Sequence, residues 1–139
     1  MTHRILVLEG ITERGAELLR AAGWPVDMET ALPPAELVKL VPPYDAILVR
    51  SGSQMNAEVI DAAKNLKVIG RAGVGVDNVD LAAATRRGVL VMNSPGGNTV
   101  STAELAVALM LALARNLAPA DLAMKGEKWD RKSFAGVEL

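Results

Sequence analysis

Short apolar runs alternate with helix-like segments along the first 98 residues of the chain. Runs of this kind, which are too short to form helices, are typical of strands that are covered on both faces of a parallel sheet. The five segments that fit this pattern are residues 5–8, 25–30, 46–49, 67–69 and 89–92. The second begins with Pro25, and because a sheet tolerates proline at an edge strand, we place this segment at the sheet edge.

Each of the first four strands is followed by a segment with helix-forming composition and recognisable end signals. Thr12 and Asn56 are the expected N-caps of two of these helices, and Asn78 or Asp77 is the expected cap of the fourth. The predicted helices span residues 13–22, 35–41, 57–63 and 79–87. This alternation predicts an α/β fold, a flavodoxin-like open sheet of five parallel strands in the order 2-1-3-4-5 with helices on both faces.

The chain changes character after Asn98. A helix predicted over residues 102–117 is apolar all round in its centre, residues 103–114, which is typical of a helix that is buried on every side. One five-stranded sheet cannot cover such a helix, so we expect it to need another partner. We therefore predict two parts: a domain of residues 1–98, and a connector helix and arm in residues 99–139 that lead toward a further domain absent from this chain.

Composition narrows the possible partners. The 15 Lys and Arg residues nearly balance the 16 Asp and Glu residues and form no basic run, which argues against nucleic acid and anionic membranes as partners. The chain has no cysteine, so disulfides and thiolate metal sites are excluded, and no other cluster has metal-ligand spacing. The longest apolar stretch is about half of what a membrane span needs. We therefore expect a soluble, cytoplasmic protein.

Three strand ends carry the polar and glycine-rich turns that a ligand site requires. Arg50 and Ser51 follow the third strand, residues 70–73 follow the fourth, and residues 93–98 follow the fifth. Ligands of open α/β sheets bind beside the carboxyl ends of the strands, and an arginine can bind a carboxylate or phosphate through two hydrogen bonds. We therefore interpret Arg50 and Arg71 as anion-binding residues. The alternative is that both pair with surface carboxylates.

The glycine-rich turn nearly matches the dinucleotide fingerprint GxGxxG, starting at Gly73. Its third position is Asn78 instead of glycine, and the next strand ends in Asn93 and Ser94 instead of an acidic residue, so it is a weak nucleotide site. The only histidine, His3, precedes the first strand and is expected in solvent at the opposite edge of the sheet. We therefore identify no catalytic residue and no metal ligand in this chain.

Four blocks of sequence resemble the D-isomer-specific 2-hydroxyacid dehydrogenases. The blocks are residues 47–51, 68–80, 91–98 and 101–105, and the resemblance follows the element order along all 139 residues. It implies a flavodoxin-like substrate domain joined to a Rossmann domain for NAD, and hydride transfer from C2 of a hydroxy acid to NAD. The family's catalytic arginine, glutamate and histidine would lie beyond Leu139. We therefore expect a dehydrogenase whose catalytic and cofactor domain is missing here, so that this chain alone is inactive.

The resemblance also implies roles for particular residues. Those expected to bind the carboxylate and phosphate of a small phosphorylated 2-hydroxy acid are Arg50, Ser51, Arg71, Gly73 and Asn98. Gly73 and Val74 would form the wall that faces substrate and nicotinamide. Relatives carry threonine at position 74, so any polar contact from that side chain to the cofactor is lost here. The helix from Thr102 to Leu117 and an arm that contains Trp129 would contact a second subunit.

Three other interpretations are compatible with the same residues. In the first, the chain is a stand-alone anion-binding or regulatory module without catalysis. In the second, it is the same domain of another family member, of the glycerate or glyoxylate type. The third and weakest alternative is a self-contained nucleotide-binding domain built on the glycine-rich turn.

Overall fold

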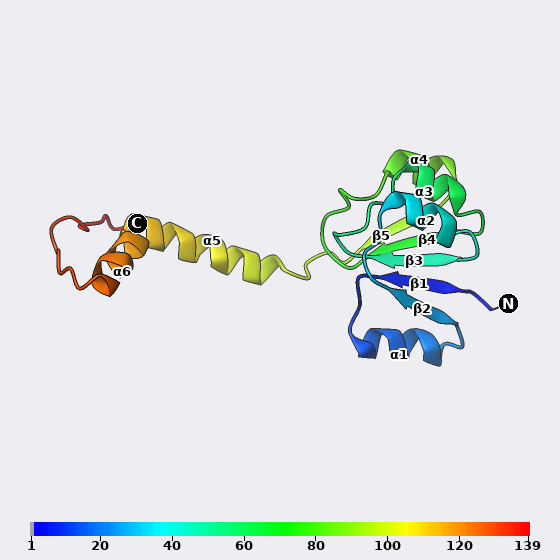
Figure 1. Cartoon of the computed structure of the whole chain (residues 1–139), viewed down its shortest axis with the longest axis horizontal. Helices are drawn as coiled ribbons and strands as arrows, with labels where there is room; N and C mark the ends of the chain where they lie inside the picture. The colour runs from blue at the N-terminus through cyan, green and yellow to red at the C-terminus, as the bar shows by residue number, and fades with distance from the viewer. Residues whose placement is uncertain (1) are drawn as a thin grey trace. The chain divides into compact units, whose positions relative to one another are not determined.

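The computed structural model describes residues 2–139, which belong to two compact units (Figure 1). The first unit ends at Gly97, and the second comprises Asn98–Leu139. The first contains the sheet and the second is helical.

The first unit is built on an open sheet of five parallel strands in the order β2-β1-β3-β4-β5. Its strands are β1 (Ile5–Leu8), β2 (Val26–Glu29), β3 (Ala46–Val49), β4 (Val68–Arg71) and β5 (Leu90–Asn93). The predicted α/β fold class, the flavodoxin-like order and the five strands are confirmed. β4 runs two residues beyond its predicted end, through Gly70 and Arg71, because its backbone still pairs there with both neighbouring strands.

Helices cover both faces of the sheet, as predicted, but unevenly. They are α1 (Glu13–Ala21), α2 (Pro34–Leu40), α3 (Ala57–Ala62) and α4 (Leu81–Arg86). Three of them, α2, α3 and α4, lie on one face, and α1 alone lies on the other (Figure 1). On the sheet face that carries α1, the part near β5 is uncovered, and Leu90 and Met92 are 57% and 54% exposed there.

The hydrophobic core fills the space between the sheet and α2, α3 and α4. Leu6, Ile47 and Ile69 enter it from β1, β3 and β4 and are fully buried. Burying a side chain of this size contributes about 1.5–3 kcal/mol to folding. This packing fixes the two strands, β3 and β4, whose carboxyl ends carry the predicted anion-binding residues.

Two of the predicted helix caps are confirmed and one is wrong. The side-chain oxygens of Thr12 and Asn56 accept hydrogen bonds from the first turns of α1 and α3. The fourth helix begins at Leu81, later than predicted, and its cap is Asp80, which accepts from the Ala83 N–H at 2.8 Å. Asn78 does not cap this helix, because its side chain is buried and donates a hydrogen bond to the carbonyl of Ser53.

The second unit consists of α5 (Thr99–Ala114), α6 (Leu117–Lys125) and a tail that returns to the end of α5. The break between the helices is at Asn116, whose left-handed backbone (φ 51°) ends the longer helix three residues before its predicted end. No residue of α5 is buried, and the expectation that this helix needs another partner to cover it stays a prediction. Within residues 2–139 too few elements pack on α5 to cover its apolar surface.

No single helix in the described part of the chain is long and apolar enough to cross a membrane. The pair α5 and α6 meets the length and composition criteria only when the two are taken together, and the pair is bent by 66°.

A carboxylate joins the segments that precede three strands at the amino edge of the sheet. Asp45, just before β3, accepts hydrogen bonds from the Arg4 N–H at 3.1 Å and from Lys67 Nζ at 2.8 Å, and His3 Nδ1 is 3.3 Å from the same carboxylate. The hydrogen bond from Lys67 is the main cause that lowers the pKa of Asp45 from 3.8 to about 2. The charged carboxylate therefore stabilises the folded state.

We expect Asp45→Asn to lower the free energy of unfolding at pH 7 by about 1–2 kcal/mol, a range that allows for solvent around Lys67. Because folding depresses the pKa of Asp45, its contribution is present above the unfolded value of 3.8 and is lost as the pH falls toward 2. Urea unfolding should thus separate the two proteins at pH 7 and not near pH 2. Asp61→Asn, an exposed carboxylate on α3, is the control. Equal stability at pH 7 would contradict the prediction.

Candidate functional site

The two predicted anion-binding arginines lie on neighbouring strands at the carboxyl edge of the sheet. Arg71 is the last residue of β4 and is paired in register with Val49, the last residue of β3. Arg50 follows Val49 directly, so the β3–β4 pairing places Arg50 one residue beyond the level of Arg71 at the same edge of the sheet. Arg50 is exposed, whereas the side chain of Arg71 is only 13% exposed.

The glycine-rich turn after β4 makes room for the guanidinium group of Arg71. A Cβ atom on Gly73 would overlap Nη1 of Arg71, and one on Gly75 would lie 3.6 Å from Nη1 and 2.8 Å from Oδ1 of Asp77. A side chain at position 73 would therefore shift the guanidinium group of Arg71, and one at position 75 would shift the carboxylate of Asp77. Gly73 thus leaves the space that Arg71 occupies, an observation independent of the fingerprint.

Arg71 is only loosely satisfied within the chain. Its Nη2 is 3.7 Å from Oδ1 of Asp77, whose side chain is 83% exposed, and its buried Nε has no hydrogen-bond partner. The alternative interpretation, in which each arginine pairs with a surface carboxylate, therefore holds for Arg71 only through one long ion pair with Asp77. Among the ion pairs of residues 2–139, none involves Arg50. Both arginines keep hydrogen-bonding capacity for an external anion.

The loop that carries Arg50 and Ser51 is held by a residue interpreted above as a helix cap. The side-chain amide of buried Asn78 donates to the carbonyl oxygens of Arg50 at 2.6 Å and Ser53 at 2.7 Å. These bonds join the end of β3 to the end of the glycine-rich turn. At the place of the third fingerprint glycine, Asn78 thus has a structural role.

Glu9 is a residue of this edge that the sequence analysis missed. It follows β1 directly, and its carboxylate accepts the backbone N–H groups of Gly52, at 2.6 Å, and Ser53. Burial raises the pKa of Glu9, but the hydrogen bonds from Ser53, Gly52 and Arg50 together outweigh it and leave the pKa below 4.5. The signal in the sequence is an acidic residue at the carboxyl end of a buried strand.

The wall beside Arg71 is tied to the end of β5. The Ser94 N–H donates to the carbonyl of Gly73 at 2.9 Å, and Asn93 Nδ2 donates to the carbonyl of Val74 at 2.7 Å. The carbonyl of Val74 therefore already has a hydrogen-bond donor, and the side chain of Val74 is exposed. The turn is fixed without a ligand.

Five of the six predicted site residues belong to the first unit, and Asn98 does not. The five that lie near the carboxyl ends of β3 and β4 are Arg50, Ser51, Arg71, Gly73 and Val74. Asn98 is the first residue of the second unit and precedes α5, where its carbonyl accepts a hydrogen bond from the Ser101 hydroxyl at 3.1 Å.

The opposite edge of the sheet has a different character. A cavity of about 300 Å³ opens there, lined mainly by apolar side chains and by His3, Trp24, Asp45 and Lys67. His3 lies at this amino edge, as predicted, and is paired with Asp45. In residues 2–139, no group of three or more His, Cys, Asp or Glu side chains is placed to hold a metal ion.

Comparisons with known proteins agree with this fold. Residues 5–135 match the family model of the D-isomer specific 2-hydroxyacid dehydrogenase, catalytic domain. A D-3-phosphoglycerate dehydrogenase of Archaeoglobus fulgidus is 55% identical over 136 residues, which are 98% of this chain and 26% of that protein. The chain therefore spans about a quarter of the length of this relative.

Solved structures give the same result. The TT0316 protein from Thermus thermophilus superposes with a TM-score of 0.84 at 36% identity, over 98% of this chain and 45% of that one. The NAD⁺-bound 3-phosphoglycerate dehydrogenase of Entamoeba histolytica superposes with a TM-score of 0.76 at 29% identity, over 100% of this chain and 44% of that one.

Proposed function

The chain belongs to the D-isomer specific 2-hydroxyacid dehydrogenase family, and we propose that it forms the substrate-binding part of an NAD-dependent D-3-phosphoglycerate dehydrogenase. The proposed reaction oxidises the C2 hydroxyl of 3-phosphoglycerate to give 3-phosphohydroxypyruvate, a step of L-serine biosynthesis. Relatives with this name match nearly the whole chain, which supports the proposal.

The observation that carries the proposal is the pair of arginines at adjacent strand ends. A substrate with a carboxylate and a phosphate needs two cationic partners, and Arg50 and Arg71 supply them with free hydrogen-bonding capacity. The exposed hydroxyl of Ser51 adds a donor beside Arg50, and Gly73 keeps the wall open. By its resemblance to the family, we also propose Asn98 as a substrate-binding residue.

The glycine-rich turn by itself does not fit a dinucleotide. Asn78 fills the position of the third glycine, and β5 ends in Asn93 instead of an acidic residue. We therefore propose that NAD, which accepts the hydride when bound, is held by residues outside this chain, and that Gly73 and Val74 face its nicotinamide. Because His3 lies at the other edge of the sheet, we expect no dehydrogenase activity from the 139-residue chain by itself.

We expect 3-phosphoglycerate to bind the 139-residue chain in isothermal titration calorimetry, and Arg50→Ala or Arg71→Ala to weaken binding by about 1.5–3 kcal/mol each, the range for hydrogen bonds to charged groups. D-Glycerate, which lacks the phosphate, should bind more weakly than 3-phosphoglycerate. Arg14→Ala, an exposed arginine on α1, is the control. Unchanged affinity in either site variant would remove that arginine from the site, and equal affinity for D-glycerate would exclude phosphate recognition.

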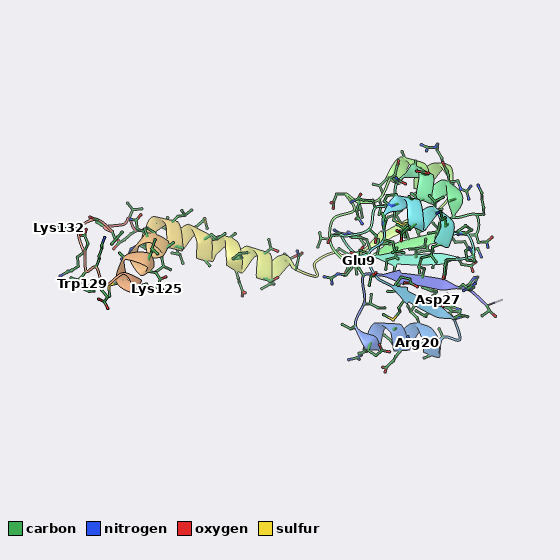
Figure 2. All side chains as sticks on the ribbon, viewed as in Figure 1. Glu9, Arg20, Asp27, Lys125, Trp129 and Lys132 are labelled. Carbon is green, nitrogen blue, oxygen red and sulfur yellow. The ribbon has the colours of Figure 1, made fainter. Side chains whose placement is uncertain are left out.

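We also propose that the protein is a homo-oligomer that associates through α5 and the arm that contains Trp129. Leucines 105, 109 and 113 recur every four residues along α5 and are all exposed, so they form an apolar stripe on one side of the helix. Trp129 lies in the tail after α6 (Figure 2), and its side chain is 75% exposed. A contiguous apolar surface of this kind is typical of an interaction site.

Sedimentation velocity should show self-association of the chain, and the double substitution Leu109→Lys and Leu113→Lys should shift it to the monomer, because two charges would enter the apolar contact. Glu104→Lys, an exposed polar position on the same helix, is the control for added charge. A monodisperse wild-type monomer at micromolar concentration would contradict the proposed association.

A further inference from the structure

Glu9 has an unusual backbone that its position alone does not explain. It lies immediately after β1 at the carboxyl edge of the sheet (Figure 2), with φ at 69°, in the left-handed region that non-glycine residues seldom adopt. Its N–H donates to the carbonyl of Glu29 at the end of β2, at 3.0 Å, so its backbone is anchored. Such a conformation persists only where surrounding contacts hold it.

The contacts that hold Glu9 are made by its carboxylate, which reaches from the end of β1 to the loop after the neighbouring strand β3. Oε2 accepts the Gly52 N–H at 2.6 Å and Oε1 accepts the Ser53 N–H, so one anion satisfies two successive backbone donors. A Cβ atom on Gly52 would lie 3.0 Å from Oε2 and 3.3 Å from the Cβ of Ala31. The absence of a side chain at position 52 therefore permits this close approach.

The same loop, residues 50–53, is also held by Asn78. The Glu9 carboxylate accepts hydrogen bonds from the N–H groups of Gly52 and Ser53, and the Asn78 amide donates to the carbonyl groups of Arg50 and Ser53. A carboxylate thus satisfies the backbone donors of the loop, and an amide satisfies its acceptors. The side chains of Arg50 and Ser51 remain exposed on this rigid support.

We propose that Glu9 is a positioning residue for substrate binding: its carboxylate holds the 50–53 loop so that Arg50 and Ser51 face the anion. This inference rests on the proposed function. It also limits how the substrate is recognised. Because Glu9 already occupies the N–H groups of Gly52 and Ser53, an incoming phosphate or carboxylate is bound at this loop by the side chains of Arg50 and Ser51 and not by those two amides.

Three substitutions separate the geometry of Glu9 from its charge. Glu9→Ala removes both acceptors; Glu9→Asp keeps the charge but is one methylene too short to reach both N–H groups; Glu9→Gln keeps the length and one acceptor oxygen. Glu29→Gln is the matched control, because Glu29 is an exposed glutamate at the end of β2. The two mild variants keep the test valid if Glu9→Ala does not fold.

Backbone amide hydrogen exchange, measured by NMR on the 139-residue chain, reads the loop directly. We expect Gly52 and Ser53 to exchange at least tenfold faster in Glu9→Ala and Glu9→Asp, with smaller acceleration in Glu9→Gln and none in Glu29→Gln. Amides of β1, such as those of Leu6 and Val7, should be unchanged. Unchanged exchange at Gly52 and Ser53, or equal acceleration throughout β1, would overturn the positioning role.

Titration of the same variants with 3-phosphoglycerate reads the consequence for binding. We expect at least tenfold weaker binding in both Glu9→Ala and Glu9→Asp, since the second variant retains the negative charge. Unchanged or tighter binding in these variants would overturn the proposal, because repulsion between Glu9 and the anion would then outweigh its support of the loop. If the wild type itself does not bind 3-phosphoglycerate, the proposed function fails separately, and the exchange rates alone decide the role of Glu9.

Discussion

The pairing of β3 with β4 is the constraint on which the rest of the site depends. It sets Val49 opposite Arg71, so Arg50 lies one residue beyond Arg71, at the end of the adjacent strand. A slip of one residue would turn Arg71 to the other face of the sheet. The register is protected by the core, where Ile47 and Ile69 are paired and fully buried, so the packing of apolar side chains determines the separation of two charged ones.

Beyond the ends of β3 and β4, polar side chains form the hydrogen bonds to the backbone that neighbouring strands form within the sheet. The segments beyond the strands have few ladder partners, and Glu9, Asn78 and Asn93 satisfy their backbone groups instead. Arg71 is the exception, since its Nε is buried without a partner and its ion pair with Asp77 is long. At this edge the main chain is held by hydrogen bonds, whereas the guanidinium group of Arg71 lacks a close partner. This combination suits the binding of a small anion without a large rearrangement.

Local signals in the sequence predicted the strands and most helix ends, because a buried strand needs a continuous apolar run and Thr12 or Asn56 can cap a helix unaided. The signals failed where distant residues decide. β4 continues past Ile69 because β3 and β5 pair with it, Asn78 bonds to a loop 25 or more positions away, and Glu9 reaches a loop more than 40 positions away. The arginines could be nominated from the sequence, but not the two residues that hold the loop of Arg50.

A crystal structure of the chain with 3-phosphoglycerate would show whether the two arginines bind the substrate. We expect the ligand at the carboxyl edge of the sheet, with its two anionic groups on the guanidinium groups of Arg50 and Arg71 and with Asp77 displaced from Arg71. Ligand bound instead in the cavity at the amino edge, beside Trp24 and Lys67, with Arg71 still paired to Asp77, would contradict it.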